Sequence, residues 1–171
     1  EVLGARMARK ILTRLRFSNE DVERVTNLIV NHMFHYTDDW TDGAVRRFMR
    51  KVSLENLDDL FLVRLADREG NGMRGGLPAP ITRLKQRIEK VIEDQNAITV
   101  RDLDINGYVV MEEFRLKPGP VIGKLLNHLL EIVLDLPEMN TREVLLEKAR
   151  EFLSGVDDGD APGADAAVGR D

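Results

Sequence analysis

The stretch LKPGPVIGKLLNHLLEIVLDLPEMNTREVLLEKA, residues 116–149, decides the fold class of this chain. Pro120 suits the first position of a helix, because proline lacks the amide hydrogen that is unpaired there, and a long apolar run follows it. Pro137 ends that helix, and Asn140 or Thr141 can cap the next one. The stretch therefore predicts two helices joined by a short connection.

Apolar residues recur with helical spacing through most of the remaining sequence. The first helix is amphipathic, with an apolar stripe formed by Leu3, Met7, Ile11 and Leu15 and with Ala8 and Leu12 between them. Further helices are expected at about 18–35, 43–52, 54–70, 80–94 and 108–114. No window alternates apolar and polar residues for long enough to predict a strand. The predicted fold class is all-α, a multi-helix bundle.

Composition divides the chain into three regions. Glycine and proline cluster at residues 70–80, which predicts a loop, and we place a boundary there between helical regions at 1–78 and 79–154. An alternative boundary lies near 97–100. Residues 155–171 carry five aspartates and few apolar side chains, so we expect them to form a disordered acidic tail.

The composition also limits the classes of function. At 171 residues and 43 % hydrophobic, the chain is long enough to bury a core. It has no cysteine, which excludes disulfides, thiolate metal sites and cysteine nucleophiles. No apolar run approaches the roughly 20 residues of a membrane span, and the first residues lack the apolar centre of a signal peptide. We therefore expect a cytoplasmic protein without a membrane partner.

Charge is distributed unevenly along the chain. Residues 1–90 carry 17 Lys and Arg against 13 Asp and Glu, whereas residues 91–171 carry 8 against 17. Basic residues of the first part recur at helical spacing, which is typical of a solvated face and also of a surface that binds a polyanion. Few aromatic residues lie among them, so contact with a duplex backbone is better supported than base stacking. These basic stripes are Arg6, Lys10 and Arg14; Arg46, Arg47, Arg50 and Lys51; and Arg83, Arg87 and Lys90.

One glycine motif matches a dinucleotide fingerprint in letters only. Gly70, Gly72 and Gly75 spell G-x-G-x-x-G. That fingerprint acts between a strand and a helix, whereas these glycines follow a predicted helix. We therefore interpret them as loop residues.

The segment KPGPVIGK, residues 117–124, is also not a nucleotide-binding loop. Three residues separate its glycines where that loop has four, and leucine follows its lysine. The open amides after Gly119 and the helix dipole still favour an anion, with Lys117 and Lys124 on either side. The alternative is an ordinary helix start in which Gly123 allows close packing.

Candidate metal and acid–base residues are sparse. His32 and His35 form an H-x-x-H pair, but a core histidine and a cation at a helix end are simpler interpretations. The carboxylates Asp38, Asp39 and Asp42 are explained by helix capping and the helix dipole. No Ser-His-Asp arrangement is readable.

Three segments, residues 1–33, 54–72 and 100–149, closely resemble the C-terminal half of bacterial-type, HD-domain-containing tRNA nucleotidyltransferases and poly(A) polymerases, the CCA-adding family. Together the resemblance covers about residues 1–153. Its most specific elements are D-I-N-G, K-P-G-P-x-I-G and P-x-x-N-T-R-E, in that order.

The resemblance implies an all-α region that grips the acceptor and T-arm duplex of tRNA, or another structured RNA, largely through the backbone. KPGPVIGK would then present a helix N-terminus to an RNA phosphate. DNA is not an expected partner. The expected RNA-binding residues are Arg6, Lys10, Arg14, Arg46, Arg47, Arg50, Lys51, Lys117, Gly119 and Lys124.

The catalytic elements of that family do not occur in this sequence. In the family they lie in an N-terminal head with a G-S type nucleotide motif and a D-x-D metal pair, followed by a neck that selects the nucleotide. We therefore expect no cofactor in this chain, with Mg²⁺ and nucleoside triphosphate required only by a head domain, on which the chain would depend. Asp67 matches the last carboxylate of the family's HD motif, whose histidine and His-Asp pair would precede Glu1, so it is a residual metal position.

Two other functions fit the residues. The chain could be a remnant HD-type phosphohydrolase that uses Asp67 and His32 with a divalent cation. It could also be a helical interaction module that dimerises through an apolar face.

Overall fold

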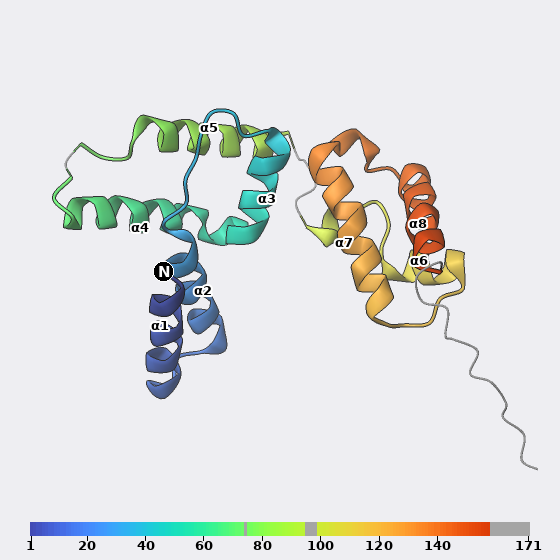
Figure 1. Cartoon of the computed structure of the whole chain (residues 1–171), viewed down its shortest axis with the longest axis horizontal. Helices are drawn as coiled ribbons and strands as arrows, with labels where there is room; N and C mark the ends of the chain where they lie inside the picture. Colours follow the sequence, from blue (N-terminus) through green and yellow to red (C-terminus); the bar gives the residue numbers. More distant parts are fainter. Residues whose placement is uncertain (74, 95–98, 158–171) are drawn as a thin grey trace, which may run out of the picture. The chain divides into compact units, whose positions relative to one another are not determined.

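The computed structural model describes residues 1–73, 75–94 and 99–157. Within these residues the chain forms eight α-helices, three short 3₁₀ helices and no strand (Figure 1). The all-α prediction is therefore confirmed. The chain divides into two compact units, Glu1–Ile98 and Thr99–Asp171.

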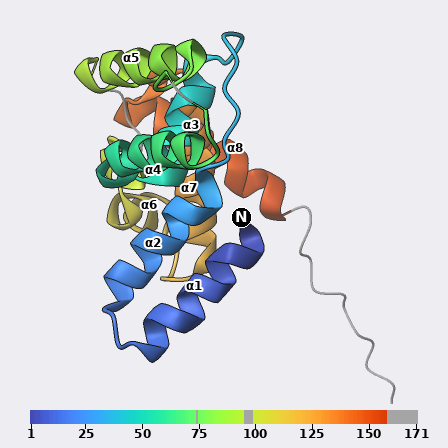
Figure 2. The ribbon, with the colours of Figure 1, turned by 90° about the vertical axis from the view of Figure 1, so that its left-hand side faces the viewer.

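The first unit combines a helical hairpin with a layer of three further helices. Helices α1 and α2 lie antiparallel and side by side, and the hairpin projects from the part of the unit that contains α3, α4 and α5 (Figures 1 and 2). Local capping sets two of the starts, since the hydroxyl of Ser18 accepts from the Asp21 amide at 3.0 Å and that of Thr41 from the Ala44 amide at 3.1 Å. The elements are α1 (Val2–Arg14), α2 (Asn19–Asn31), α3 (Asp42–Val52), η1 (Leu54–Asn56), α4 (Leu57–Gly70) and α5 (Ala79–Glu93).

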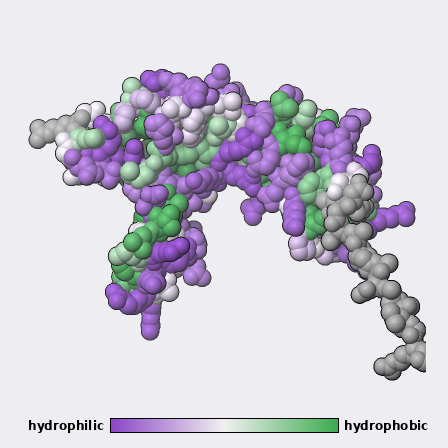
Figure 3. Space-filling model, in the orientation of Figure 1, coloured by the Kyte–Doolittle hydropathy of each residue, from purple (hydrophilic) through white to green (hydrophobic). Residues whose placement is uncertain are grey.

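Helix α1 packs on α2 mainly through small side chains. Ala5 is buried, and a β-carbon placed on Gly4 would lie 3.6 Å from Cγ2 of Ile29. On the predicted apolar face, Ala8 and Leu12 are half-buried, whereas the four stripe residues stay exposed, because alanine and glycine let the two backbones approach closely. Figure 3 shows apolar surface on this hairpin. The stripe residues are 45–69 % exposed: Leu3, Met7, Ile11 and Leu15.

The core of the first unit lies between α3, α4, α5 and the segment after α2. Helix α2 ends at Asn31, earlier than the predicted residue 35. The chain then leaves the helix, and Phe34 packs on Phe48 of α3 with ring centroids 5.0 Å apart. Helix α4 is less buried than its apolar sequence suggests, because it covers this core on one side only and leaves Leu62 62 % exposed.

Helix α5 belongs to the first unit. Its buried residues Ile81, Leu84 and Ile88 join the core formed with α3 and α4. The boundary predicted at 78/79 placed α5 in the second region. The contacts place α5 in the first unit, because the residues that bury its apolar face belong to that unit. The division between the units falls after Ile98, at the alternative boundary near 97–100.

The second unit is organised around α7. The apolar side chains of this helix form a broad face that runs along it, and the neighbouring elements bury that face. A β-carbon on Gly107 would lie 3.3 Å from Cγ2 of Ile122, which explains why glycine begins α6 where it crosses α7. Its elements are η2 (Val100–Asp102), α6 (Gly107–Phe114), α7 (Pro120–Asp135), η3 (Pro137–Met139) and α8 (Arg142–Asp157).

Helix α8 continues to Asp157, so residues 155–157 of the predicted tail are helical. The rest of that predicted disordered tail, residues 158–171, lies outside the described residues. In the described part of the chain, no helix combines the length and the apolar character that crossing a membrane requires.

Candidate nucleic-acid interface

The start of α7 is open to solvent. Gly119 precedes the helix in an extended conformation, no side chain caps the helix, and its first turn contains no acidic residue. Lys117, Gly119 and Lys124 are all exposed. Unpaired amides at a helix start carry partial positive charge, and two cations in the same short segment add to it. This arrangement favours an anion such as a phosphate group.

Gly123 does not serve close packing at this position. A β-carbon built on it would meet no atom within 4 Å. The interpretation of Gly123 as a packing residue is therefore wrong. The surface above it is open, next to Lys124.

The basic stripe of α1 lies on the surface as predicted. Arg6, Lys10 and Arg14 are exposed. Arg9, which the sequence analysis did not single out, instead donates to both carboxylate oxygens of Glu23 at 2.7 and 2.9 Å and thereby ties α1 to α2. This hydrogen bond lowers the pKa of the Glu23 carboxyl. The sequence feature that could have indicated this role is the position of Arg9 next to Ala5 and Ala8, on the side of α1 that packs on α2.

The basic residues of α3 are not all on the surface. Arg46 is 5 % exposed, so the expectation that it faces solvent is wrong. Helix α3 packs against α2, α4 and α5. The buried surface therefore extends far enough around the helix to include Arg46. Arg47 and Arg50 are half-buried and engaged with other groups, whereas Lys51 is exposed.

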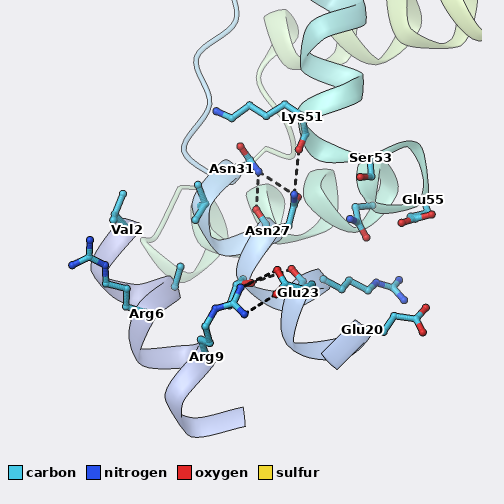
Figure 4. A pocket seen from close by; sticks show the side chains of 15 residues that line it. Val2, Arg6, Arg9, Glu20, Glu23, Asn27, Asn31, Lys51, Ser53 and Glu55 are labelled. Carbon is cyan, nitrogen blue, oxygen red and sulfur yellow. Dashed lines mark hydrogen bonds and ion pairs between the residues drawn. The ribbon is translucent and has the colours of Figure 1, made fainter. Parts of the chain in front are cut away.

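Two of the predicted stripes each contribute one residue to a cavity of the first unit, which we call the basic cavity (Figure 4). It has a volume of about 710 Å³ and is lined by residues of α1, α2 and the end of α3, including Arg6 and Lys51. Asn27 donates to the Lys51 carbonyl at 3.2 Å, and Asn31 donates to the Asn27 carbonyl at 2.9 Å. Figure 4 shows the side chains of Arg6 and Lys51 extending away from this network. Glu20, Glu23 and Glu55 also line the cavity, so its charge is mixed.

In the third stripe Arg83 and Arg87 form internal ion pairs, whereas Lys90 is exposed. Arg83 of α5 donates to both oxygens of Asp38, at 2.9 and 2.7 Å. Arg87 donates to Asp42 at 2.5 Å and to the Trp40 carbonyl at 2.8 Å. The hydrogen bonds from Arg83 and Arg87 lower the pKa of the Asp38 and Asp42 carboxyls. These arginines fix the segment before α3 to α5. Because the carboxylates neutralise their charge, the two arginines attract a polyanion less strongly.

The pair formed by Arg87 and Asp42 predicts a pH-dependent contribution to stability. Asp42→Asn should lower the free energy of unfolding at neutral pH by about 0.5–1 kcal/mol, as expected for a partly exposed ion pair. Because folding depresses the pKa of Asp42, this stabilisation is fully present above the ordinary carboxyl pKa and is lost as pH falls through the folded value. The gap between wild type and variant should therefore narrow below about pH 4.

Urea denaturation monitored by Trp40 fluorescence measures this gap. Asp39→Asn is the matched control, since no ion pair of Asp39 is found in the described residues. A gap that stays constant from neutral pH to about pH 3 would show that the charge of Asp42 is not the cause.

The residual metal position has no supporting cluster. Asp67 accepts a hydrogen bond from the Asn71 amide at 3.2 Å, and His32 Nδ1 lies 2.6 Å from the Ile29 carbonyl oxygen. Across residues 1–73, 75–94 and 99–157, no group of three or more His, Asp or Glu side chains could hold a metal ion. Nothing in this geometry favours the phosphohydrolase alternative, and metal binding by Asp67 stays a prediction.

Two of the sequence motifs meet in the second unit. Asn140, from P-x-x-N-T-R-E, accepts from the Asp104 amide at 2.9 Å and donates to the Asp102 carbonyl at 2.8 Å. The carboxylate of Asp104, from D-I-N-G, accepts from the Arg142 amide at 2.7 Å at the start of α8. Asn106 is a helix cap, since its side chain accepts from two amides of α6. These motifs therefore have structural roles, and sequence analysis missed the capping role of Asp104 because the two segments lie far apart along the chain.

Comparison with known protein families gives a match over most of the chain. The family "tRNA nucleotidyltransferase domain 2 putative" matches residues 2–149. The chain belongs to this tRNA nucleotidyltransferase family.

Two curated relatives support the assignment. An A-adding tRNA nucleotidyltransferase of Deinococcus radiodurans is 34 % identical over 134 residues, which are 75 % of this chain and 29 % of the relative. A CC-adding tRNA nucleotidyltransferase of Thermus thermophilus is 34 % identical over 152 residues, which are 88 % of this chain and 32 % of the relative. The chain thus spans less than a third of either relative. No solved structure matches it.

Proposed function

We propose that this chain is the tRNA-binding region of a cytoplasmic tRNA nucleotidyltransferase, and that it supports nucleotide addition to the 3′ end by a separate head domain. The observation that carries this proposal is the family match over residues 2–149, together with relatives named for A addition and CC addition to tRNA. Mg²⁺ and a nucleoside triphosphate would then be requirements of the head domain. The region itself would hold RNA without a cofactor.

The proposed contacts are exposed cations on each unit. In the first unit they are Arg6, Lys10, Arg14 and Lys51, with the half-buried Arg47 and Arg50 in support. In the second unit the open start of α7 would receive a phosphate between Lys117 and Lys124. Arg46 is left out of the proposal because it is buried. Duplex RNA is usually held through its shape and backbone, which suits cations more than base-reading groups.

The proposal predicts salt-dependent binding of tRNA. Affinity should fall steeply as salt rises, because each neutralised phosphate releases counterions. Lys117→Ala/Lys124→Ala should reduce the log–log slope by about one for each lost phosphate contact. Filter binding of labelled tRNA across a salt series measures this slope.

The matched control is Lys148→Ala, which removes a lysine of the same unit that pairs with Glu151 at 2.8 Å. We expect its slope to equal that of the wild type. Weak, salt-independent binding by the unmodified chain would reject the tRNA-binding function.

A second candidate is self-association through α1, which the exposed apolar stripe of that helix favours. An apolar face of this kind can be covered by a second copy. Sedimentation that changes with protein concentration, and that Met7→Glu abolishes, would support this function. A concentration-independent monomer would reject it.

A further inference from the structure

A second cavity adjoins the basic cavity in the first unit, and we call it the aromatic cavity. It has a volume of about 510 Å³, within the range of small-molecule sites. Its apolar lining comes from the end of α2, from the segment before α3 and from α3 itself, and includes Met33, Phe34, Trp40 and Phe48.

The aromatic rings form one packed group. Phe48 lies between Phe34 and Trp40, at centroid distances of 5.0 and 5.7 Å. Phe48 is buried, whereas Phe34 and Trp40 are only half-buried and keep part of their surface accessible. Rings held by their neighbours lose little freedom when a planar group stacks on them, and a base stacked on an aromatic side chain is a recurring mode of single-strand binding.

Cations lie beside these rings. Lys51 is exposed, and Arg47 lines the same cavity from the same helix. The carboxylate in the lining is that of Glu1. A ligand that combines a planar apolar group with a negative charge therefore suits the cavity better than an uncharged apolar one.

The two cavities share part of their lining. Val30, Asn31 and Lys51 belong to both. Arg6 and Lys51 could thus follow a phosphate backbone through the basic cavity, and the aromatic cavity lies at the Lys51 end of that path. This order suits a strand that leaves a duplex and places one nucleotide against the rings.

We propose that the aromatic cavity binds one unstacked nucleotide of the RNA, with its base against Trp40 and Phe34 and its phosphate at Lys51. The inference rests on the proposed RNA-binding function and adds a site that reads a single-stranded position. Sequence analysis argued against stacking because few aromatic residues lie among the basic ones. The fold instead brings Phe34 and Trp40 next to Arg47 and Lys51.

Trp40 is the single tryptophan of the chain, so its fluorescence reports on this cavity directly. Titration of the chain with AMP, excited where the nucleobase does not absorb, should quench Trp40 in a saturable manner. Adenosine should bind about tenfold more weakly, because the contact between phosphate and Lys51 is lost. A single-stranded oligonucleotide should quench more strongly than the same strand in a blunt duplex.

Two methionines provide matched variants. Met33 lines the cavity and Met73 does not, yet both are 55 % exposed, and each has its sulfur near an arginine nitrogen, at 3.4 Å from Arg64 and 3.5 Å from Arg68. Met33→Glu should weaken AMP binding at least about tenfold by placing a negative charge in the lining of a cavity that takes an anionic ligand. Met73→Glu should change it less than about twofold. The exposure of both positions keeps either variant folded.

Removal of one cation gives a second comparison. Lys51→Ala should weaken AMP binding and leave adenosine binding unchanged, whereas Lys85→Ala, outside the cavity, should affect neither. Equal quenching by AMP and adenosine, unchanged by Lys51→Ala, would overturn the proposal and leave only an apolar cavity. The same conclusion follows if Met33→Glu binds AMP like the wild type.

The result also separates this inference from the tRNA function. Salt-dependent tRNA binding without any change at Trp40 would overturn the nucleotide site and retain the proposed function. Saturable quenching by AMP without salt-dependent tRNA binding would retain the site and reject the function.

Discussion

Leu129→Ala is expected to destabilise the second unit by about 3–5 kcal/mol while the first unit keeps its wild-type stability. Leu129 is fully buried in α7, the central helix of the unit. Truncation removes its apolar contacts and leaves a cavity, and both effects lower the free energy of unfolding. Since small domains are stable by only about 5–15 kcal/mol, much of the second unit's stability would be lost.

Two probes measure this separately for each unit. Trp40 lies in the first unit, and far-ultraviolet circular dichroism follows the helices of both. We expect the variant to show an early loss of helical signal in urea, with an unchanged transition at Trp40. Leu136→Ala is the matched control, since Leu136 is 43 % exposed and should cost less than about 1 kcal/mol. A Trp40 transition that shifts together with the helical signal would show that the two units unfold as one.

The second large effect is expected where the two motifs meet. Asp104→Ala and Asn140→Ala should each lower the free energy of unfolding of the second unit by about 1–2 kcal/mol. Asp104 supplies a charged acceptor to the start of α8, and Asn140 holds the backbone on both sides of Leu103. The double variant should lose less than the sum, because either change releases the segment that carries the other contact.

Urea denaturation of the four proteins of this double-mutant cycle tests the coupling. Glu112→Ala is a control that removes an exposed carboxylate from α6. Affinity for tRNA, measured in the absence of urea, should stay at the wild-type level in the folded variants. Additive losses would contradict the coupling, and a loss of tRNA affinity in a folded variant would show that these motif residues contact RNA.

The sequence by itself determined the fold class, where the helices start and the family. Helical periodicity and the caps at Ser18 and Thr41 depend on residues within one turn of each other, so they could be read without the fold. The same holds for the proline at the start of α7. The order of the three motifs indicated the tRNA nucleotidyltransferase family, which the comparisons confirm.

The tertiary structure decided which faces of the helices are covered. Periodicity identifies an apolar stripe but does not say which helix will pack on it. Helix α1 packs on α2 mainly through small residues and leaves its large apolar stripe exposed. Arg46 was expected outside and is inside, because three helices surround α3. Arg83 and Arg87 form ion pairs with carboxylates more than forty residues away along the chain, and no local sequence pattern indicates such pairs.

The candidate sites divide along the same line. The open start of α7 depends on a few consecutive residues, so the sequence alone was enough to recognise it. The aromatic cavity instead joins the end of α2, Trp40 and α3, and its rings and cations become neighbours only after these segments pack. Backbone geometry fixes contacts between residues near in sequence, whereas contacts between distant residues depend on which apolar surfaces exclude water together.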